Sequence, residues 1–283
     1  MKKYLQIYKA TLIENLSYIT NIIIGFFSFL MMVFVLFNLW EYMYQDSSNY
    51  INGYTMQQMF WYVLITEGIW YGTRNKAFIY EIGDTIKSGN IAYNINKPYN
   101  YIIYLVFKCL GDITIKFIMF MFIVILVGNI FISPLEIALF SIPLICIVMF
   151  LGILINMLIR IGISIVSFWI EDSHPFHWVY DKIILILGTL LPIEMFPIFL
   201  RPIIKCLPTY VVVYGPAKLI VDFSFENFKK IIFAQIVYFV LVSIIIAIMY
   251  NKGVKKLNVN GGYKTYKDYF FICKIQSYET NVK

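Results

Sequence analysis

Charged residues are scarce in this chain. Only 14% of its 283 residues are Asp, Glu, Lys or Arg, whereas about a quarter of a typical soluble domain is charged. Hydrophobic residues make up 60% of the sequence and aromatic residues 19%, so a water-soluble fold would expose many Phe, Ile and Tyr side chains. The composition therefore excludes an ordinary soluble domain and indicates a chain embedded in a lipid bilayer.

Cysteine is also rare, and nucleotide-binding motifs are missing. The four cysteines fall in different predicted layers and form no CxxC pair, so the sequence suggests neither a disulfide framework nor a metal site. It contains no G-x-x-x-x-G-K-[ST] phosphate loop, so any ATP must be handled by another chain. With no internal repeat or low-complexity linker, we expect a single membrane domain at residues 1–262 and a cytoplasmic tail at 263–283.

Long apolar stretches predict six transmembrane helices. Residues 15–40 contain no charge, and 26 residues of helix exceed the hydrocarbon core of a bilayer, which is about 30 Å thick. We expect spans at about residues 19–40, 57–71, 103–132, 137–169, 181–193 and 231–250. The second stretch is short and contains Glu67. Five or seven spans therefore remain alternatives to six.

Basic residues orient these spans. The amino-terminal segment, the loop after the second span and the tail are rich in lysine, whereas the loop at 41–56 has Glu41 and Asp46 and no base. Cytoplasmic loops collect Lys and Arg, so both termini are expected in the cytoplasm. Arg201, Lys205 and Lys218 on the outer side are exceptions. The net charge of +7 fits anionic membrane lipids as partners and requires no nucleic acid.

Charged residues inside the predicted spans are candidates for a transport path or gate. They are Glu67, Lys108, Asp112 and Lys116. The last three stand at i, i+4 and i+8, which places one acid between two bases on a single helix face. This face is either a self-compensating stripe or a gate or subunit contact. Glu67 has either a structural hydrogen-bonding role or a place on the transport path.

One cluster of titratable residues invites an enzymatic or metal-binding interpretation: Glu171, His174 and His177. The H-P-F-H spacing lacks the i, i+4 geometry by which two histidines share a helix face, and Pro175 interrupts a helix between them. We therefore expect a solvated cytoplasmic loop and no metal. An intramembrane enzyme that uses these three residues remains an alternative class.

An amphipathic helix is predicted between the second and third spans. Residues 78–89 read FIYEIGDTIKSG, and Ile79, Ile82 and Ile86 recur at helical spacing. Glu81, Asp84 and Lys87 fall on the other faces. Ser88 and Gly89 can end the helix, because glycine adopts the left-handed conformation that helix ends often need. Periodicity alone is equally typical of a membrane-surface anchor.

Four short segments resemble the ABC-2 type permease family. Residues 82–98, IGDTIKSGNIAYNINKP, are similar to the family's "D-I-R-S-G … R-P" pattern after the second span. Residues 191–208, LPIEMFPIFLRPIIKCLP, with Tyr214-Gly215-Pro216, resemble "P-L-x-x-F-P-x-W-L … L-P-F … P". Residues 168–172, FWIED, match "F-W-x-E-D", and 250–262 resemble the ending of the two-permease branch. Asn90 and Asn96 depart from the pattern, replacing an acid and a base.

The resemblance implies the type V exporter fold. It comprises six spans, an interfacial amino-terminal helix and re-entrant outer helices before the last span. The amino-terminal segment, with Leu5, Tyr8 and Leu12 on one face, is equally typical of a generic anchor. The outer cap maps to Pro192, Glu194, Phe196, Pro197, Pro208 and Pro216. The helix that couples to the ATPase maps to Ile79, Glu81, Ile82, Asp84, Ile86, Lys87, Ser88 and Gly89, within a coupling segment at about 78–98.

The resemblance also implies the function. The chain would be a non-catalytic permease of the bacterial plasma membrane that binds no cofactor itself. It would pair with a second permease, a heterodimer in preference to a homodimer, and with a separate ATPase that binds ATP and Mg. The cargo would be exported and amphipathic, such as a peptide antibiotic, a drug or a lipid-like molecule, because Phe, Met, Ile and Tyr would line the cavity. A secondary multidrug carrier and a sensor or assembly subunit remain alternatives.

Overall fold

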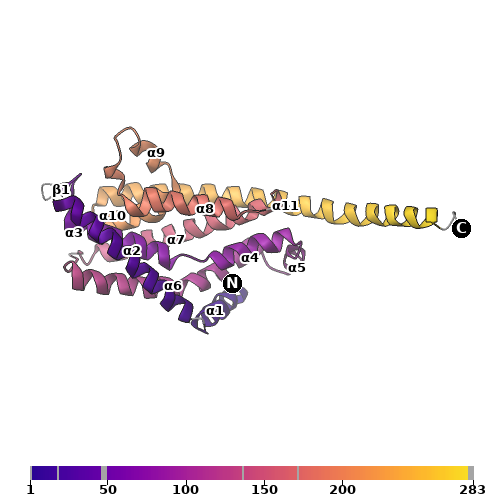
Figure 1. Cartoon of the computed structure of the whole chain (residues 1–283), viewed down its shortest axis with the longest axis horizontal. Helices are drawn as coiled ribbons and strands as arrows, with labels where there is room; N and C mark the ends of the chain where they lie inside the picture. The colour runs from indigo at the N-terminus through magenta and orange to yellow at the C-terminus, as the bar shows by residue number, and fades with distance from the viewer. Residues whose placement is uncertain (1, 18, 46–49, 136, 171, 280–283) are drawn as a thin grey trace.

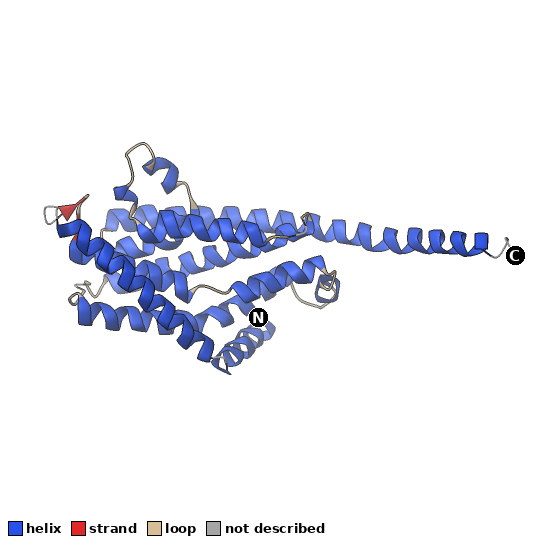
Figure 2. Ribbon diagram, viewed as in Figure 1, coloured by secondary structure: helices blue, strands red, loops and turns tan. Residues whose placement is uncertain are grey.

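Helices form almost all of the described chain. The computed structural model describes residues 2–17, 19–45, 50–135, 137–170 and 172–279, with 257–279 described as backbone. In these ranges the strands are limited to one antiparallel hairpin, β1 (Tyr50–Ile51) and β2 (Tyr54–Thr55). Figure 2 shows this hairpin at one end of a bundle of roughly parallel and antiparallel helices. The expected all-α membrane fold is confirmed at this level.

Four helices are long and apolar enough to cross a membrane. They are α2 (Ile19–Gln45), α6 (Tyr101–Phe131), α7 (Ser141–Ile165) and α11 (Phe225–Glu279), and in α11 the apolar part ends at Lys256. They correspond to the first, third, fourth and sixth predicted spans. Their outward faces stay apolar: Phe34 is 65% exposed and Phe233 69%. Lipid solvates such surfaces and water does not.

The helices at the second and fifth predicted spans are too short for their length alone to identify them as membrane spans. Helix α3 (Met56–Gly72) is about 26 Å long and is buried along most of its length. Helix α8 (His174–Ile184) continues through a π-helical segment, η2 (Leu185–Leu190). Helix α3 packs inside the bundle, where it contacts α2, α6, η2 and α10 (Gly215–Val221). Helix α8 keeps an outward face, on which Trp178 is 59% and Val179 49% exposed. The count of six spans therefore stays a prediction.

Between η2 and α11 the chain is broken into short pieces. They are η3 (Ile193–Met195), α9 (Arg201–Lys205), η4 (Tyr210–Tyr214) and α10 (Gly215–Val221). Pro202 and Pro216 stand in the first turns of α9 and α10, where proline's missing N–H costs nothing. A Cβ on Gly152 of α7 would lie 3.2 Å from the carbonyl oxygens of Val211 and Val212. Helix η4 can therefore approach the backbone of α7 closely.

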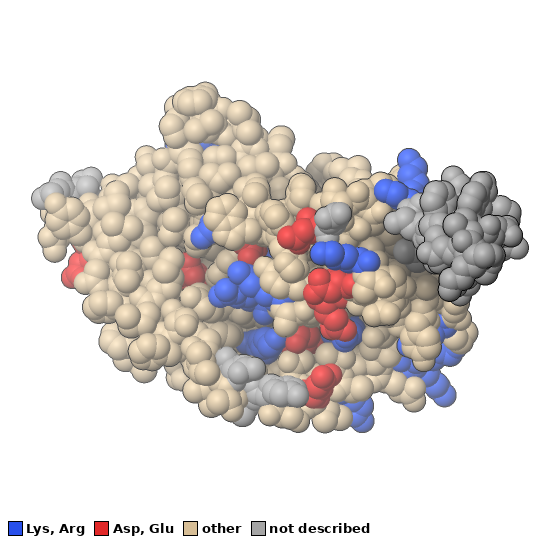
Figure 3. All heavy atoms as spheres, turned by 45° about the vertical axis from the view of Figure 1, so that its right-hand side comes forward, with Lys and Arg blue, Asp and Glu red and all other residues tan. Residues whose placement is uncertain are grey.

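The two ends of the bundle differ in their elements and their charge. In Figure 1, α1 (Lys2–Ser17), α4 (Lys76–Lys87), α5 (Ile91–Ile95) and the last turns of α11 lie toward one end, hereafter the α4 end. The β1–β2 hairpin and α9 lie toward the other, hereafter the hairpin end. Figure 3 shows acidic and basic side chains gathered over the α4 end, while the opposite part of that face is largely uncharged.

Buried side chains connect these elements into two main cores. The larger core surrounds α3 and joins α2, α6, η4 and α10. The second joins α4 to α6, α7 and α11, around residues such as Ile82, Leu105 and Ile161. Helix α1 packs along α6, where a Cβ on Gly111 would lie 2.7 Å from the carbonyl oxygen of Tyr8. Thus α4 is a wall of the second core rather than an isolated surface helix.

Candidate functional site

Helix α4 has the two faces that the sequence predicts. Ile79, Ile82 and Ile86 are each at most 3% exposed, whereas Glu81 and Asp84 are exposed. Lys87 and Ser88 are exposed as well. The helix ends at Lys87, with Ser88 as its C-cap, and Gly89 follows at a φ of +77°. The helix, its amphipathic character and its glycine stop are therefore confirmed.

The buried face of α4 lies directly on other helices. A Cβ on Gly83 would lie 2.9 Å from Oγ of Ser173 and 3.2 Å from Oγ of Ser167. A side chain at position 83 would therefore require a shift of the Ser173 hydroxyl or of α4 itself. The Ser164 hydroxyl donates a hydrogen bond to the carbonyl oxygen of Ile79 at 3.0 Å. Gly83 thus permits close packing of α4 on the bundle, and the hydrogen bond from the Ser164 side chain to the α4 backbone stabilises it.

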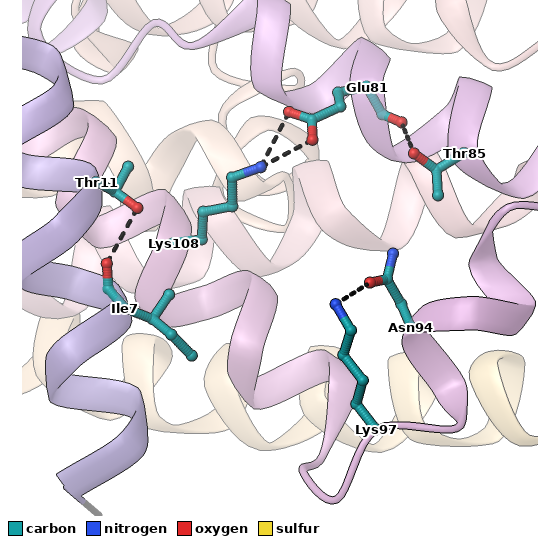
Figure 4. Close-up of polar contacts among 7 residues, drawn as sticks. All are labelled: Ile7, Thr11, Glu81, Thr85, Asn94, Lys97 and Lys108. Carbon is teal, nitrogen blue, oxygen red and sulfur yellow. Dashed lines mark hydrogen bonds and ion pairs between the residues drawn. The ribbon is translucent and has the colours of Figure 1, made fainter.

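An ion pair fixes the outer edge of α4 to α6. Lys108 Nζ lies 2.8 and 3.1 Å from the two carboxylate oxygens of Glu81, and Figure 4 shows both contacts. Lys116 pairs with Asp112 at 3.0 Å. The three charged residues on this face of α6 therefore have different partners. Asp112 and Lys116 neutralise each other's charge, whereas Lys108 pairs with Glu81 of α4. Because the Glu81 side chain is 58% exposed, this pair contributes about 0–1 kcal/mol to stability.

A buried charge cluster behind α4 is a feature that the sequence analysis missed. The Arg160 guanidinium of α7 lies 2.8 Å from the Asp181 carboxylate of α8, and their side chains are 4% and 9% exposed. Lys76, the first residue of α4, lies 3.7 Å from the same carboxylate. The available signal was Arg160 itself, the one charged residue within the stretch 141–168. Its partner lies 21 positions away, too far for a helical pairing rule to find.

Hydrogen bonds extend this cluster to α3. Asn156 of α7 accepts from Arg160 Nε at 3.3 Å and from the Tyr180 hydroxyl at 3.0 Å. Its Nδ2 donates to Oγ1 of Thr73, the C-cap of α3, at 3.2 Å. The segment that leads from α3 into α4 is therefore tied to α7 and α8. Because these groups are buried and bonded to one another, they form a rigid connection.

The two histidines lie in this region, and the expectation of a solvated loop is wrong for His177. Residues 174–184 form α8, and Pro175 occupies its first turn, where proline begins a helix rather than breaking it. His177 is 2% exposed, and its Nε2 lies 3.0 Å from Ser164 Oγ. Burial, together with the nearby charge of Arg160, lowers the pKa of His177 to about 3.

The two histidines make separate contacts within the described residues. The His174 ring is 3.9 Å, centre to centre, from the Tyr80 ring, and its Nδ1 lies 3.6 Å from Asp172. Glu171, the third residue of the predicted cluster, lies outside the described residues. Within the described part of the chain, no group of three His, Cys, Asp or Glu side chains could hold a metal ion. The buried His177 side chain of α8 lies against Ser164 of α7 and the Tyr80 ring of α4.

Glu67 lies deep in the bundle, on α3. It is 1% exposed, and neither carboxylate oxygen has a hydrogen-bond partner among the described residues. The adjacent Thr66 hydroxyl bonds to the carbonyl oxygens of Val63 and Thr189. A charged carboxylate without partners is costly in such surroundings. The structure thus places Glu67 away from Lys108, Asp112 and Lys116, with which it pairs in no described contact.

The residues of the expected outer cap meet at the hairpin end. The Glu194 carboxylate accepts hydrogen bonds from the hydroxyls of Tyr54, at 3.0 Å, and Tyr214. Arg201 donates to the carbonyl oxygens of Glu194 and Phe196, at 2.7 and 2.9 Å. Pro192 precedes η3, Pro197 follows it, Pro208 precedes η4 and Pro216 begins α10. One carboxylate therefore joins the loop after α2 to the segment before α11.

Comparison with known families identifies the arrangement. A sequence model for ABC-2 family transporter proteins matches residues 12–261, which include every element described above except residues 2–11 of α1 and residues 262–279 of α11. The chain belongs to the ABC-2 transporter family. A search of curated proteins found no match. This ABC-2 protein is therefore a multi-pass membrane protein and a transporter permease subunit, and it works with an ATPase subunit.

Proposed function

We propose that this ABC-2 chain is a six-span, non-catalytic permease subunit that exports an amphipathic molecule from the bacterial cytoplasm. A separate ATPase would bind ATP and Mg and supply the energy, and a second ABC-2 permease would complete the pathway as a heterodimer. The observation that carries the proposal is α4. It presents an exposed charged face, with Glu81, Asp84 and Lys87, while its other face is buried in the bundle.

Coupling would run through α4 as a rigid lever. An ATPase bound to the exposed face would move α4 when it closes around ATP. Three described contacts join that helix to the bundle: Gly83 against Ser173, Ser164 to the Ile79 carbonyl, and the Arg160–Asp181 cluster at its first turn. A helix held along its buried face would pass a displacement on with little loss. Helices α7 and α8 would then move with it.

The topology that we propose places the α4 end in the cytoplasm. Helix α3 and residues 181–193, which include the end of α8 and η2, would be the second and fifth spans. Helix α3 would be shielded from lipid by the surrounding helices. Irregular backbone at membrane depth is tolerated only against protein or water. Helix η4 in the broken segment from η3 to α10 fits that rule, because Val211, Val212 and Val213 are each at most 2% exposed. This segment would close the outer end of the pathway.

Purification from the native host in mild detergent tests the proposal. An ATPase that co-purifies with the wild-type chain should be lost from Asp84→Arg/Lys87→Glu, because both side chains are exposed and neither has a described ion pair. Lys205→Glu, a charge reversal on the exposed surface at the hairpin end, is the matched control and should retain the ATPase. Retention by the α4 double variant would remove α4 as the docking site. Absence of any ATPase from the wild type would overturn the exporter assembly.

A further inference from the structure

A cavity lies at the α4 end, on the side of the bundle formed by α2, α4 and α6. Its volume is about 650 Å³, enough for a lipid headgroup and the start of its chains. Ile22, Phe78 and Phe120 form an apolar part of the wall. Ile24, also in the wall, is 63% exposed on α2. The apolar side of the cavity is therefore continuous with the outward, lipid-facing surface of α2.

The polar side of the cavity carries an excess of positive charge. Its basic side chains are Arg74, Lys76 and Lys116, and its one acid among the described residues is Asp112. Asp112 already pairs with Lys116 at 3.0 Å. Lys76 shares Asp181 with Arg160, which lies closer to that carboxylate. Arg74 has no ion pair within 4.0 Å among the described residues. Two positive charges therefore remain without a matching acid.

A buried amide adds a further polar group. Asn75 lines the cavity, is 5% exposed, and its Oδ1 has no hydrogen-bond partner among the described residues. Its Nδ2 donates to Sγ of Cys109 at 2.8 Å. An unbonded buried carbonyl oxygen is unfavourable and accepts a hydrogen bond from a ligand hydroxyl readily. The wall thus offers cations for an anion and an acceptor for a hydroxyl group.

We propose that this cavity binds an anionic phospholipid whose headgroup carries a free hydroxyl, such as phosphatidylglycerol. The phosphodiester lies among Arg74, Lys76 and Lys116, a headgroup hydroxyl donates to Asn75, and the acyl chains run along Phe78 and Phe120 toward the bilayer. Basic pockets between membrane helices suit such headgroups. The proposal goes beyond export function, since it requires only that the chain lies in a bilayer. A soluble phosphate compound has the same anionic group but no chains for the apolar wall.

Native mass spectrometry of the purified complex tests the proposal. The complex is reconstituted in nanodiscs of equimolar phosphatidylglycerol and phosphatidylcholine and then released into detergent. The wild type should retain phosphatidylglycerol in preference to phosphatidylcholine. Arg74→Gln/Lys116→Gln should lower this retention roughly tenfold, because each base near a lipid surface contributes measurably to binding. Lys252→Gln, which removes one charge from the exposed surface of α11, should leave retention unchanged.

A second variant and a direct label separate a true site from general attraction to lipid. Gly25 lines the cavity, and a Cβ at this position would lie 3.4 Å from the Phe120 ring. Gly25→Leu therefore fills space without altering charge and should also abolish retention. A photoactivatable phosphatidylglycerol should crosslink wild-type peptides from α2 and α6. Equal retention of both lipids, crosslinks confined to other helices, or displacement by inorganic phosphate would overturn the proposal. None of these measurements depends on ATP or transport, so a failed export assay would leave them intact.

Discussion

At the scale of single residues, the Arg160–Asp181 pair has the largest expected energetic effect. Both side chains are at least nine-tenths buried, and the ion pair spans α7 and α8 at 2.8 Å. Removal of one partner from such a pair leaves an uncompensated buried charge, whereas replacement of both by apolar residues is often tolerated. The pair therefore affects stability chiefly when one partner is removed, because the other charge is then left buried without a counter-charge.

Asp181→Asn should lower the free energy of unfolding by about 3–5 kcal/mol, because Arg160 and Lys76 would face a neutral amide. Thermal unfolding in mild detergent measures the effect. The double variant Arg160→Met/Asp181→Leu is the control and should recover most of the loss. A double variant as unstable as the single one would show that the pair has no special role, and that the site tolerates no change at all.

His177 predicts a pH dependence of stability. Its pKa is lowered to about 3 in the folded chain, whereas an unfolded histidine titrates near pH 6.5. The unfolded state therefore binds the proton more readily, so the stability that the neutral ring provides is present above about pH 6.5. It is lost as pH falls toward 3, at up to about 1.4 kcal/mol per pH unit. Thermal unfolding at pH 7 and pH 5 measures the loss.

Variants of the two histidines test whether His177 causes this pH dependence. His177→Gln should flatten the pH dependence between pH 7 and pH 5. His174→Gln should leave it in place, because the His174 side chain is 40% exposed. Equal behaviour of the two variants would contradict the assignment to His177.

At the scale of elements, the sequence predicts helices that are marked by a local residue pattern. It misses contacts between residues that are far apart in the sequence. Helix α4 is predictable because Ile79, Ile82 and Ile86 mark one face at helical spacing. Pro175 suggests a helix break, since nothing local distinguishes a first-turn proline from an interior one. The spacing of Lys108 and Asp112 suggests a pair on one helix, yet Glu81 on α4 is the partner of Lys108.

The close packing of α4 on the bundle predicts that larger side chains at position 83 cause larger losses of stability and coupling. Gly83→Ala places a Cβ within 2.9 Å of Ser173 Oγ, and overpacking of this kind costs about 1–3 kcal/mol. Gly83→Ala should also weaken the coupling of ATP hydrolysis to transport, and Gly83→Leu should displace α4 further and weaken the coupling more. Transport and ATPase rates of the reconstituted complex measure the coupling. Adding Ser173→Gly to Gly83→Ala should restore coupling. Failure of this rescue would indicate that the contact does not position α4.

At the scale of the whole molecule, sequence and structure agree that basic residues gather at one end. The sequence predicts six spans, whereas helix length in the structure supports four. Basic residues are concentrated in α1, α4 and the end of α11, and these elements share one end of the bundle. The apolar length of α2, α6, α7 and α11 is readable from the sequence. The positions of Arg160, Asp181 and Glu194 are not, because each lies against a segment distant in sequence. Such contacts depend on how the helices pack, which no periodicity encodes.

The proposed six-span topology predicts an alternating pattern of accessibility. In a cysteine-free background, single cysteines are introduced along the chain and labelled in intact cells with a membrane-impermeant thiol reagent. Asn52→Cys, Leu139→Cys and Ile198→Cys should react from outside. Asp84→Cys, Asp172→Cys and Lys252→Cys should react only after permeabilisation, because basic segments stay in the cytoplasm. Protection at Asn52 would contradict the amino-terminal orientation, and labelling of both Asn52 and Asp84 from outside would contradict the second span.

The Glu194 contact has a consequence for the resting transporter. Tyr54 and Tyr214 approach one carboxylate from segments that are 160 positions apart, and Tyr44 adds a hydrogen bond to the Tyr54 carbonyl oxygen at 2.9 Å. This junction lies at the end of the bundle opposite α4. In the mechanism that we propose, the barrier against passive leakage would thus be built separately from the machinery that responds to ATP. An idle pump would then remain sealed while its ATPase dissociates, exchanges nucleotide or is still being synthesised.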